Sequence, residues 1–78
     1  MDIITTIEEY DKIRKRLGLS DRRVIADIAK SGHKLNKDFF TFWRKGRVKC
    51  PQVHNLKAIT EYLKKREKLW ELINMDNV

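Results

Sequence analysis

The sequence has few residues that crosslink or interrupt a chain, with one cysteine, one proline and three glycines among its 78 residues. A single cysteine, Cys50, excludes an internal disulfide, which is typical of intracellular proteins. No apolar run approaches the roughly 18 residues of a membrane-spanning helix. We therefore expect a cytoplasmic protein with no membrane partner. A chain of this length predicts a single domain, residues 1–78, with a small core.

Groupings of catalytic or metal-binding residues are also scarce. His33 and His54 are the only imidazoles, and no local motif suggests a Ser/His/Asp, Cys/His or paired-carboxylate site. Cys50 and His54 are four positions apart, but two ligands do not make a zinc site. Three glycines are too few for a glycine-rich phosphate loop. We expect no enzymatic activity, no cofactor and no metal.

Positive charge is abundant and concentrated in the middle of the chain. The formal net charge is +7, and residues 21–50 hold nine basic side chains against three acidic ones. Basic and acidic residues nearly balance in the segments on either side. Such a local excess of cations favours a polyanionic partner such as nucleic acid. Taken alone, the basic composition fits a solvated surface equally well.

Capping signals and apolar periodicity predict an all-α, compact domain of four to five helices. Thr6 and Glu9 form a capping box before a stripe of apolar residues that ends at Gly18. Ser20 is the expected N-cap of a second helix, which Gly32 ends. Its small residues, Ala26 and Ala29, are sites where another helix can approach closely.

A further helix is expected after residue 50, with Pro51 at its first position. Apolar residues then recur at steps of three, three and four, at Val53, Leu56, Ile59 and Leu63. Residues 64–78 either extend this helix or form a fifth one. They carry more apolar side chains than one stripe needs, which makes three of them candidates for a dimer surface: Leu69, Trp70 and Ile73. The alternative is that this segment only completes the core of a monomer.

The stretch L-N-K-D-F-F-T-F-W-R-K-G-R, residues 35–47, places four aromatic residues among cations. Asn36 is the expected N-cap and Gly46 the expected stop of a helix from Lys37 to Lys45. Phe40 and Trp43 are three apart, so they share a face, which we assign with Leu35 to the core.

The opposite side of this helix has side chains suited to reading base edges. Lys37 can donate to guanine, Asp38 can accept from cytosine, and Thr41 can contact a thymine methyl or a base edge. The predicted base-reading set is Asn36, Lys37, Asp38, Thr41 and Phe42.

Two arginines earlier in the chain suit a phosphate, and two further classes of partner also fit the sequence. Arg22 and Arg23 lie in a first helical turn, which is mildly unfavourable for cations unless a phosphate faces them. A competing interpretation makes Phe39 and Phe42, together with the Trp70 end, a patch that binds a host protein. RNA binding is a third interpretation.

Residues 20–63 resemble the Cro/C1-type (XRE-like) helix-turn-helix regulators of phages and bacteria. The residues that carry the resemblance are Ala26, Leu35 with Asn36, Phe40, Trp43, Gly46, Pro51, Asn55 with Leu56, Ile59, and Tyr62 with Leu63. The distance from Ala26 to Gly46 exceeds the family pattern by roughly one helical turn, so the turn between the second and third helices is enlarged.

The resemblance implies a regulator of transcription that binds double-stranded DNA through its third helix in the major groove. It implies phosphate contacts from Arg22, Arg23, Arg44, Lys45, Arg47 and Lys49. It also implies a homodimer on two half-sites about 34 Å apart. A host protein such as RNA polymerase would be a further partner.

Overall fold

The computed structural model describes residues 3–75, which form four α-helices and, within that range, no strand. The helices are α1 (Ile7–Arg16), α2 (Asp21–Lys30), α3 (Phe39–Arg44) and α4 (Val53–Met75). This confirms the predicted all-α class with four helices, because α4 runs on without a break at residue 64. Of the predicted segment 64–78, residues 76–78 lie outside the described residues. No helix among the described residues is long and apolar enough to cross a membrane.

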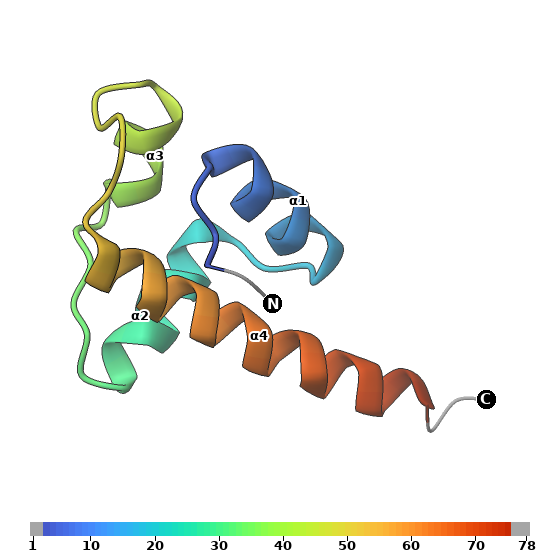
Figure 1. Ribbon diagram of the computed structural model, residues 1–78. Helices are drawn as coiled ribbons and strands as arrows, with labels where there is room; N and C mark the ends of the chain where they lie inside the picture. The colour runs from blue at the N-terminus through green and yellow to red at the C-terminus, as the bar shows by residue number, and fades with distance from the viewer. Residues whose placement is uncertain (1–2, 76–78) are drawn as a thin grey trace.

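The helices pair in two groups, with α1 against α3 and α2 against α4, and these are the largest interhelical contacts. Figure 1 shows α4 crossing the molecule, with its C-terminal half projecting beyond the other helices. The core between them is apolar and consists of Ile4, Tyr10, Leu19, Val24, Ile28, Phe40, Trp43, Leu56, Ile59 and Leu63. The α1–α3 pairing holds the aromatic stretch of the sequence against the rest of the molecule.

Both predicted helix starts before α3 are confirmed. The Thr6 hydroxyl accepts from the Glu9 amide at 3.2 Å, and the Ser20 hydroxyl accepts from the Arg23 amide at 3.1 Å. These side chains satisfy amides that the first helical turn leaves without a backbone partner. Gly18 has φ +70°, and this turn folds the buried Leu19 back beside α1 as expected.

The start of the third helix was predicted two residues too early. The helix has six residues, and Asp38, not Asn36, is its N-cap. The Asn36 side-chain oxygen instead accepts from the Asp38 amide at 2.8 Å, in an Asx turn that precedes the helix. Lys37 therefore lies in the turn and not in α3. An asparagine two positions before an N-cap residue competes with helical hydrogen bonding in this way.

Three other predictions were wrong: the first residue of the fourth helix, the burial of Val53, and close helix packing at two alanines. The fourth helix begins at Val53, two residues after Pro51, and Val53 is 61% exposed instead of lying in the core. Ala26 and Ala29 are exposed, so they are not sites of close helix approach. The reason is that α2 presents Val24 and Ile28 to the core, which turns the alanines outward.

Candidate nucleic-acid interface

The inner face of α3 is fixed to α1 by aromatic packing. The Phe40 ring stacks on the Tyr10 ring with 4.0 Å between centroids and 3° between planes. The Trp43 ring lies 6.4 Å from the Tyr10 ring, and both α3 aromatics are buried. Leu35 is partly buried against the same core. The three predicted core supports of this helix therefore occupy the positions expected of them.

The Phe39 ring packs edge-on against two of its neighbours. It lies 5.1 Å from the Phe40 ring and 6.1 Å from the Trp43 ring, at steep interplanar angles. Edge-to-face contacts of this kind are favourable for aromatic rings. Phe39 therefore borders the core and is only partly available to a partner, whereas Phe42 makes no ring contact of this kind among the described residues.

The reading surface consists of the predicted base-reading residues, of which Asn36, Lys37 and Asp38 precede α3 and Thr41 and Phe42 lie on it. Asn36 and Lys37 are exposed, whereas Asp38, Thr41 and Phe42 are half-buried. Because the Asn36 oxygen already accepts from a backbone amide, its side-chain NH₂ is the group left to donate. The surface therefore offers amide, ammonium and hydroxyl donors beside one carboxylate.

A shallow hollow joins this surface to the first turn of α2. Its lining includes Arg22 from α2 and Lys37 and Asp38 from the turn before α3. Asp21 and Ile25 complete it. The structure therefore brings together one predicted phosphate contact and two predicted base-reading residues. The sequence predicts the same partner for these residues but does not show that they lie side by side.

Arg44 lies in a cluster of charges at the junction of three helices. Its guanidinium donates to Asp11 of α1 at 2.7 and 3.0 Å and to Asp21 of α2 at 3.2 Å. Arg14 forms further ion pairs with the same two carboxylates, and the Tyr10 hydroxyl donates to Asp21 at 2.8 Å. These contacts hold the C-terminal end of α3 against both α1 and α2.

The hydrogen bonds of the cluster shift the ionisation of its members. The hydrogen bond from Arg44 lowers the pKa of Asp11, although partial burial opposes this change. The same bond raises the pKa of Arg44. Burial, followed by the hydrogen bond to Asp21, raises the pKa of Tyr10. Asp11 was not singled out from the sequence, and its only local signal was its spacing of three from Arg14.

Arg23 is also paired. Its guanidinium donates to Asp27 at 3.0 Å, and the Tyr62 hydroxyl of α4 donates to the same carboxylate. The hydrogen bond from Tyr62 is the main cause of the lowered pKa of Asp27. Burial raises the pKa of Tyr62 to about 12. This group links α2 to α4.

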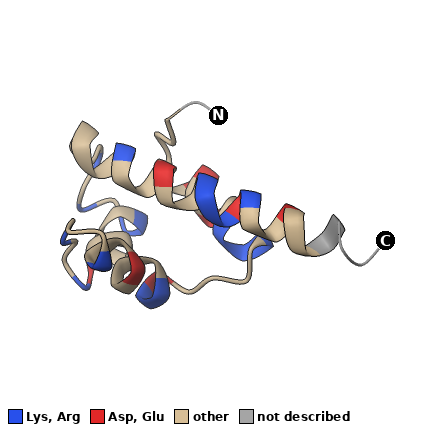
Figure 2. Ribbon diagram, turned by 90° about the horizontal axis from the view of Figure 1, so that it is seen from below, with Lys and Arg blue, Asp and Glu red and all other residues tan. Residues whose placement is uncertain are grey.

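The six predicted phosphate contacts therefore divide into two kinds. Arg23 and Arg44 are held by carboxylates. The other four are exposed, and their side chains make no ion pair within residues 3–75: Arg22, Lys45, Arg47 and Lys49. Figure 2 shows that α4 also carries basic positions, together with acidic ones. The four unpaired cations are the stronger candidates for a phosphate.

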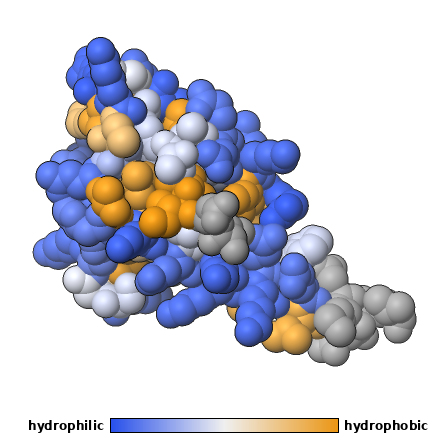
Figure 3. Space-filling model, viewed as in Figure 1, coloured by the Kyte–Doolittle hydropathy of each residue, from blue (hydrophilic) through white to orange (hydrophobic). Residues whose placement is uncertain are grey.

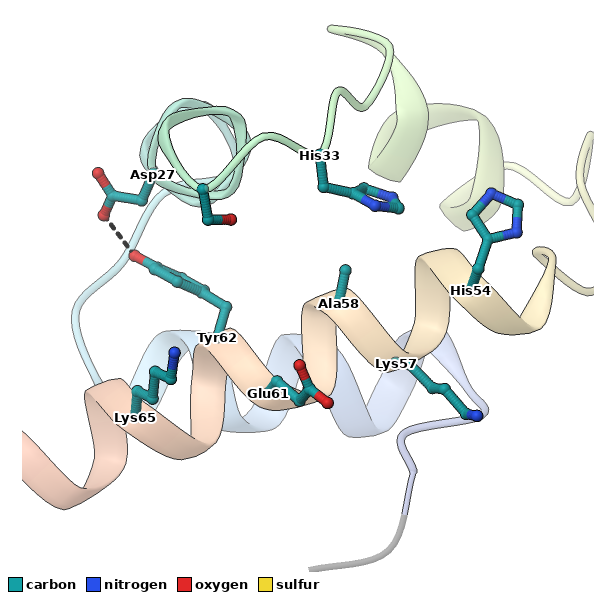
Figure 4. Close-up of a pocket in the computed structure, with 9 residues that line it drawn as sticks. Asp27, His33, His54, Lys57, Ala58, Glu61, Tyr62 and Lys65 are labelled. Atoms are coloured by element: carbon teal, nitrogen blue, oxygen red, sulfur yellow. Dashed lines mark hydrogen bonds between the residues drawn. The ribbon is translucent and has the colours of Figure 1, made fainter.

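A second hollow, of about 590 Å³, lies between α2 and α4 and is shown in Figure 4. The ring of His33 points from the connection after α2 toward His54 of α4, with 5.6 Å between ring centroids. A His33 ring nitrogen lies 2.7 Å from the Asn55 side-chain oxygen. No group of three or more metal-ligating side chains occurs in the described part of the chain. Positive and negative side chains alternate around this hollow, so it does not select a ligand by charge.

The C-terminal half of α4 carries the three residues predicted for a dimer surface. Leu69, Trp70 and Ile73 are about half exposed and line a small hollow together with Leu17 and Arg66. Figure 3 shows a largely polar surface with hydrophobic side chains near the end of α4 and in the middle of the face in view.

Comparison of the chain with known proteins found no matching protein family, curated protein or solved structure.

Proposed function

We propose that this chain is a sequence-specific double-stranded DNA-binding protein, a small transcriptional regulator of the phage or bacterial type. The observation that carries the proposal is the two-sided character of α3. Its inner face is held by Phe40 and Trp43, and its outer side and flanking turns carry polar residues and unpaired cations. A short helix fixed in this way can be presented to a groove without first becoming ordered.

The size of α3 supports insertion in the major groove. Six residues rise by about 9 Å, which is less than the major-groove width of about 12 Å. The turns at both ends of α3 therefore lie close enough to the groove for their side chains to reach base edges. Residues 31–38 separate α2 from α3, and this connection exceeds the three- to four-residue turn of a typical helix-turn-helix. We therefore assign contacts from the surface of this protein and not from the docking angle of the resembled family.

The unpaired cations support phosphate binding on either side of the reading surface. Arg22 lies on α2, whereas Lys45 and Lys49 follow the C-terminal end of α3. Contacts to the backbone on both sides would set the register of α3 in the groove. About three such contacts predict that affinity falls roughly 40-fold between about 50 and 200 mM salt.

Fluorescence anisotropy with a labelled random duplex over this salt range tests the proposal. Lys45→Ala should weaken binding and flatten the dependence of log K on log salt by about one contact. Lys68→Ala is the matched control, because Lys68 is an exposed lysine in the C-terminal half of α4. Absence of duplex binding at the lowest salt would refute the proposal. If duplex binding is observed, selection from a random duplex library will identify the target sequence. A palindromic target would indicate a symmetric dimer.

The exposed apolar side chains of α4 favour a second candidate, in which the protein binds a host protein such as RNA polymerase. Leu69 and Leu72 are exposed on the projecting part of the helix. Apolar residues gathered in this way are typical of protein interfaces. The two candidates differ in salt dependence, because an apolar contact does not weaken as counterions are added.

A further inference from the structure

The C-terminal end of α3 forms a Schellman turn that folds one side chain back over another. Gly46 has φ +80°, the Gly46 amide donates to the Trp43 carbonyl at 3.1 Å, and the Arg47 amide donates to the Phe42 carbonyl at 2.9 Å. This pair of bonds brings the side chains of Arg47 and Phe42 together, at positions where an apolar contact is common. Here the contact is a cation–π interaction, with the Arg47 guanidinium carbon 5.5 Å from the centroid of the Phe42 ring.

The guanidinium of Arg47 is oriented but its donors are not used. Among the described residues its side chain forms no hydrogen bond and no ion pair, in contrast to Arg44 and Arg23. An aromatic ring contacts the face of a guanidinium, so the N–H donors at its edge stay available. The ring therefore holds a flat, forked donor in place at little further cost in side-chain entropy on binding.

We propose that Arg47, positioned by Phe42, reads guanine in a 5′-TpG-3′ step of duplex DNA and does not serve as a phosphate contact. This inference rests on the proposed function. The fork of Arg47 matches the O6 and N7 acceptors of guanine, which is the commonest specific contact in the major groove. The methyl group of a thymine on the 5′ side lies beside guanine N7 in the same groove. Phe42 supplies the apolar surface that this methyl group contacts.

A phosphate contact would need neither member of this arrangement. Any exposed lysine can neutralise a phosphate as a point charge on a flexible stem, and any exposed arginine can do so without an aromatic ring beside it. The fork of an arginine can also bind two oxygens of one phosphate. The assignment to guanine therefore rests on the ring, because an apolar surface beside the guanidinium is used by a thymine methyl group and not by a phosphate.

The test begins with wild-type protein and the duplex that it selects from a random library. We expect a TpG step in that duplex. Replacing its guanine by 7-deazaguanine, which lacks the N7 acceptor, should weaken binding about tenfold. Replacing its thymine by uracil should weaken binding by a smaller factor, because only the methyl contact is lost. These measurements need no protein variant, so they decide the proposal even if a variant fails to fold.

Two variants distinguish the effect of the planar guanidinium of Arg47 from the effect of its positive charge. Arg47→Lys should keep the salt dependence of binding but lose the preference for the TpG duplex over one with an altered step. Phe42→Leu, checked for folding by circular dichroism, should lose the same preference, and the double variant should lose little more. Lys45→Ala is the matched control and should weaken binding to both duplexes equally.

Equal weakening of all duplexes by Arg47→Ala, with the salt slope reduced by about one contact, would overturn the inference and make Arg47 a phosphate contact. Unchanged affinity for the 7-deazaguanine duplex would also overturn it. Both results leave the proposed function intact. Failure of the wild-type protein to bind any duplex at low salt is a different result, because it refutes the proposed function itself.

Discussion

The guanidinium of Arg44 on α3 donates two hydrogen bonds to the carboxylate of Asp11 on α1, from Nη2 at 2.7 Å and from Nε at 3.0 Å. This bidentate pair joins two helices whose rings already stack through Tyr10 and Phe40. The polar and aromatic contacts act on the same pair of helices, so together they set the orientation of α3. The position of the proposed reading surface depends on this pair.

Replacing Arg44 should therefore destabilise the fold. Arg44→Ala should lower the free energy of unfolding by about 1–2 kcal/mol, a range reduced because the Arg44 side chain is more than one-third exposed. The neighbouring variant Lys45→Ala is the control, and we expect a change within about 0.5 kcal/mol. Urea denaturation followed by circular dichroism measures both values. Equal stabilities for the two variants would contradict a structural role for the Arg44–Asp11 pair.

The same pair predicts a loss of stability in acid. The Arg44 hydrogen bond lowers the pKa of Asp11 below its ordinary value of 3.8, so the folded protein holds this carboxylate ionised more readily than the unfolded chain does. The resulting stabilisation is complete above about pH 5 and is lost as the pH falls through the lowered pKa. Asp11→Asn should make unfolding less dependent on pH in this range. Urea denaturation at several pH values measures this, and an equally steep loss of stability in wild-type protein and Asp11→Asn would contradict the prediction.

At alkaline pH the contribution of Tyr62 has the opposite sign. Its pKa is raised to about 12, because burial and the bond to Asp27 favour the neutral phenol. The stabilisation is complete below the unfolded pKa of about 10 and is lost as the pH rises through about 12. Tyr62→Phe should cost about 1 kcal/mol at neutral pH and remove its part of this alkaline dependence. Ultraviolet titration should show less tyrosinate at about pH 11 in folded than in denatured protein; equal absorbance would contradict the assignment.

The reading surface and the flanking cations should differ in their effects on DNA binding. Thr41→Ala and Lys37→Ala should change which duplex is preferred, whereas Arg22→Ala should weaken all duplexes alike and reduce the salt slope by about one contact. Competition between a selected and a random duplex measures the preference. A uniform loss from all three variants would place base reading elsewhere on the protein.

The end of α4 can be tested independently of DNA. If Leu69, Trp70 and Ile73 form a dimer surface, Trp70→Ala should raise the monomer fraction in sedimentation equilibrium. Lys68→Ala, on the same turn of the helix, should leave the fraction nearly unchanged. An unchanged oligomeric state in Trp70→Ala would reject the role of this residue in a dimer.

Local signals in the sequence predicted most of the elements. Thr6 and Ser20 were identified as N-caps because capping joins residues only three positions apart. Apolar spacing predicted the burial of Tyr10, Phe40 and Ile59, because residues three or four positions apart share one face of a helix. The start of α3 was placed wrongly because Asn36 can cap a helix or form an Asx turn, and its neighbours do not distinguish the two.

Contacts between distant residues required the tertiary structure. The Arg44–Asp11 bond joins residues 33 positions apart, and the Tyr62–Asp27 bond joins residues 35 apart. The sequence alone predicts Arg44, Arg23 and Arg47 equally as phosphate contacts, because each is a cation near a predicted helix end. Helix packing separated them, since it places carboxylates beside the first two and an aromatic ring beside the third.

The sequence by itself determined where most of the helices lie, which of their faces are apolar and that positive charge gathers around residues 21–50. These properties depend on side chains within a turn or two of one another, or on composition alone. The tertiary structure decided which cations remain unpaired, because that depends on how α1, α2 and α3 meet. It also set Lys37 beside Arg22 on one surface, since a turn and a helix start far apart in the chain come together only when the core is packed.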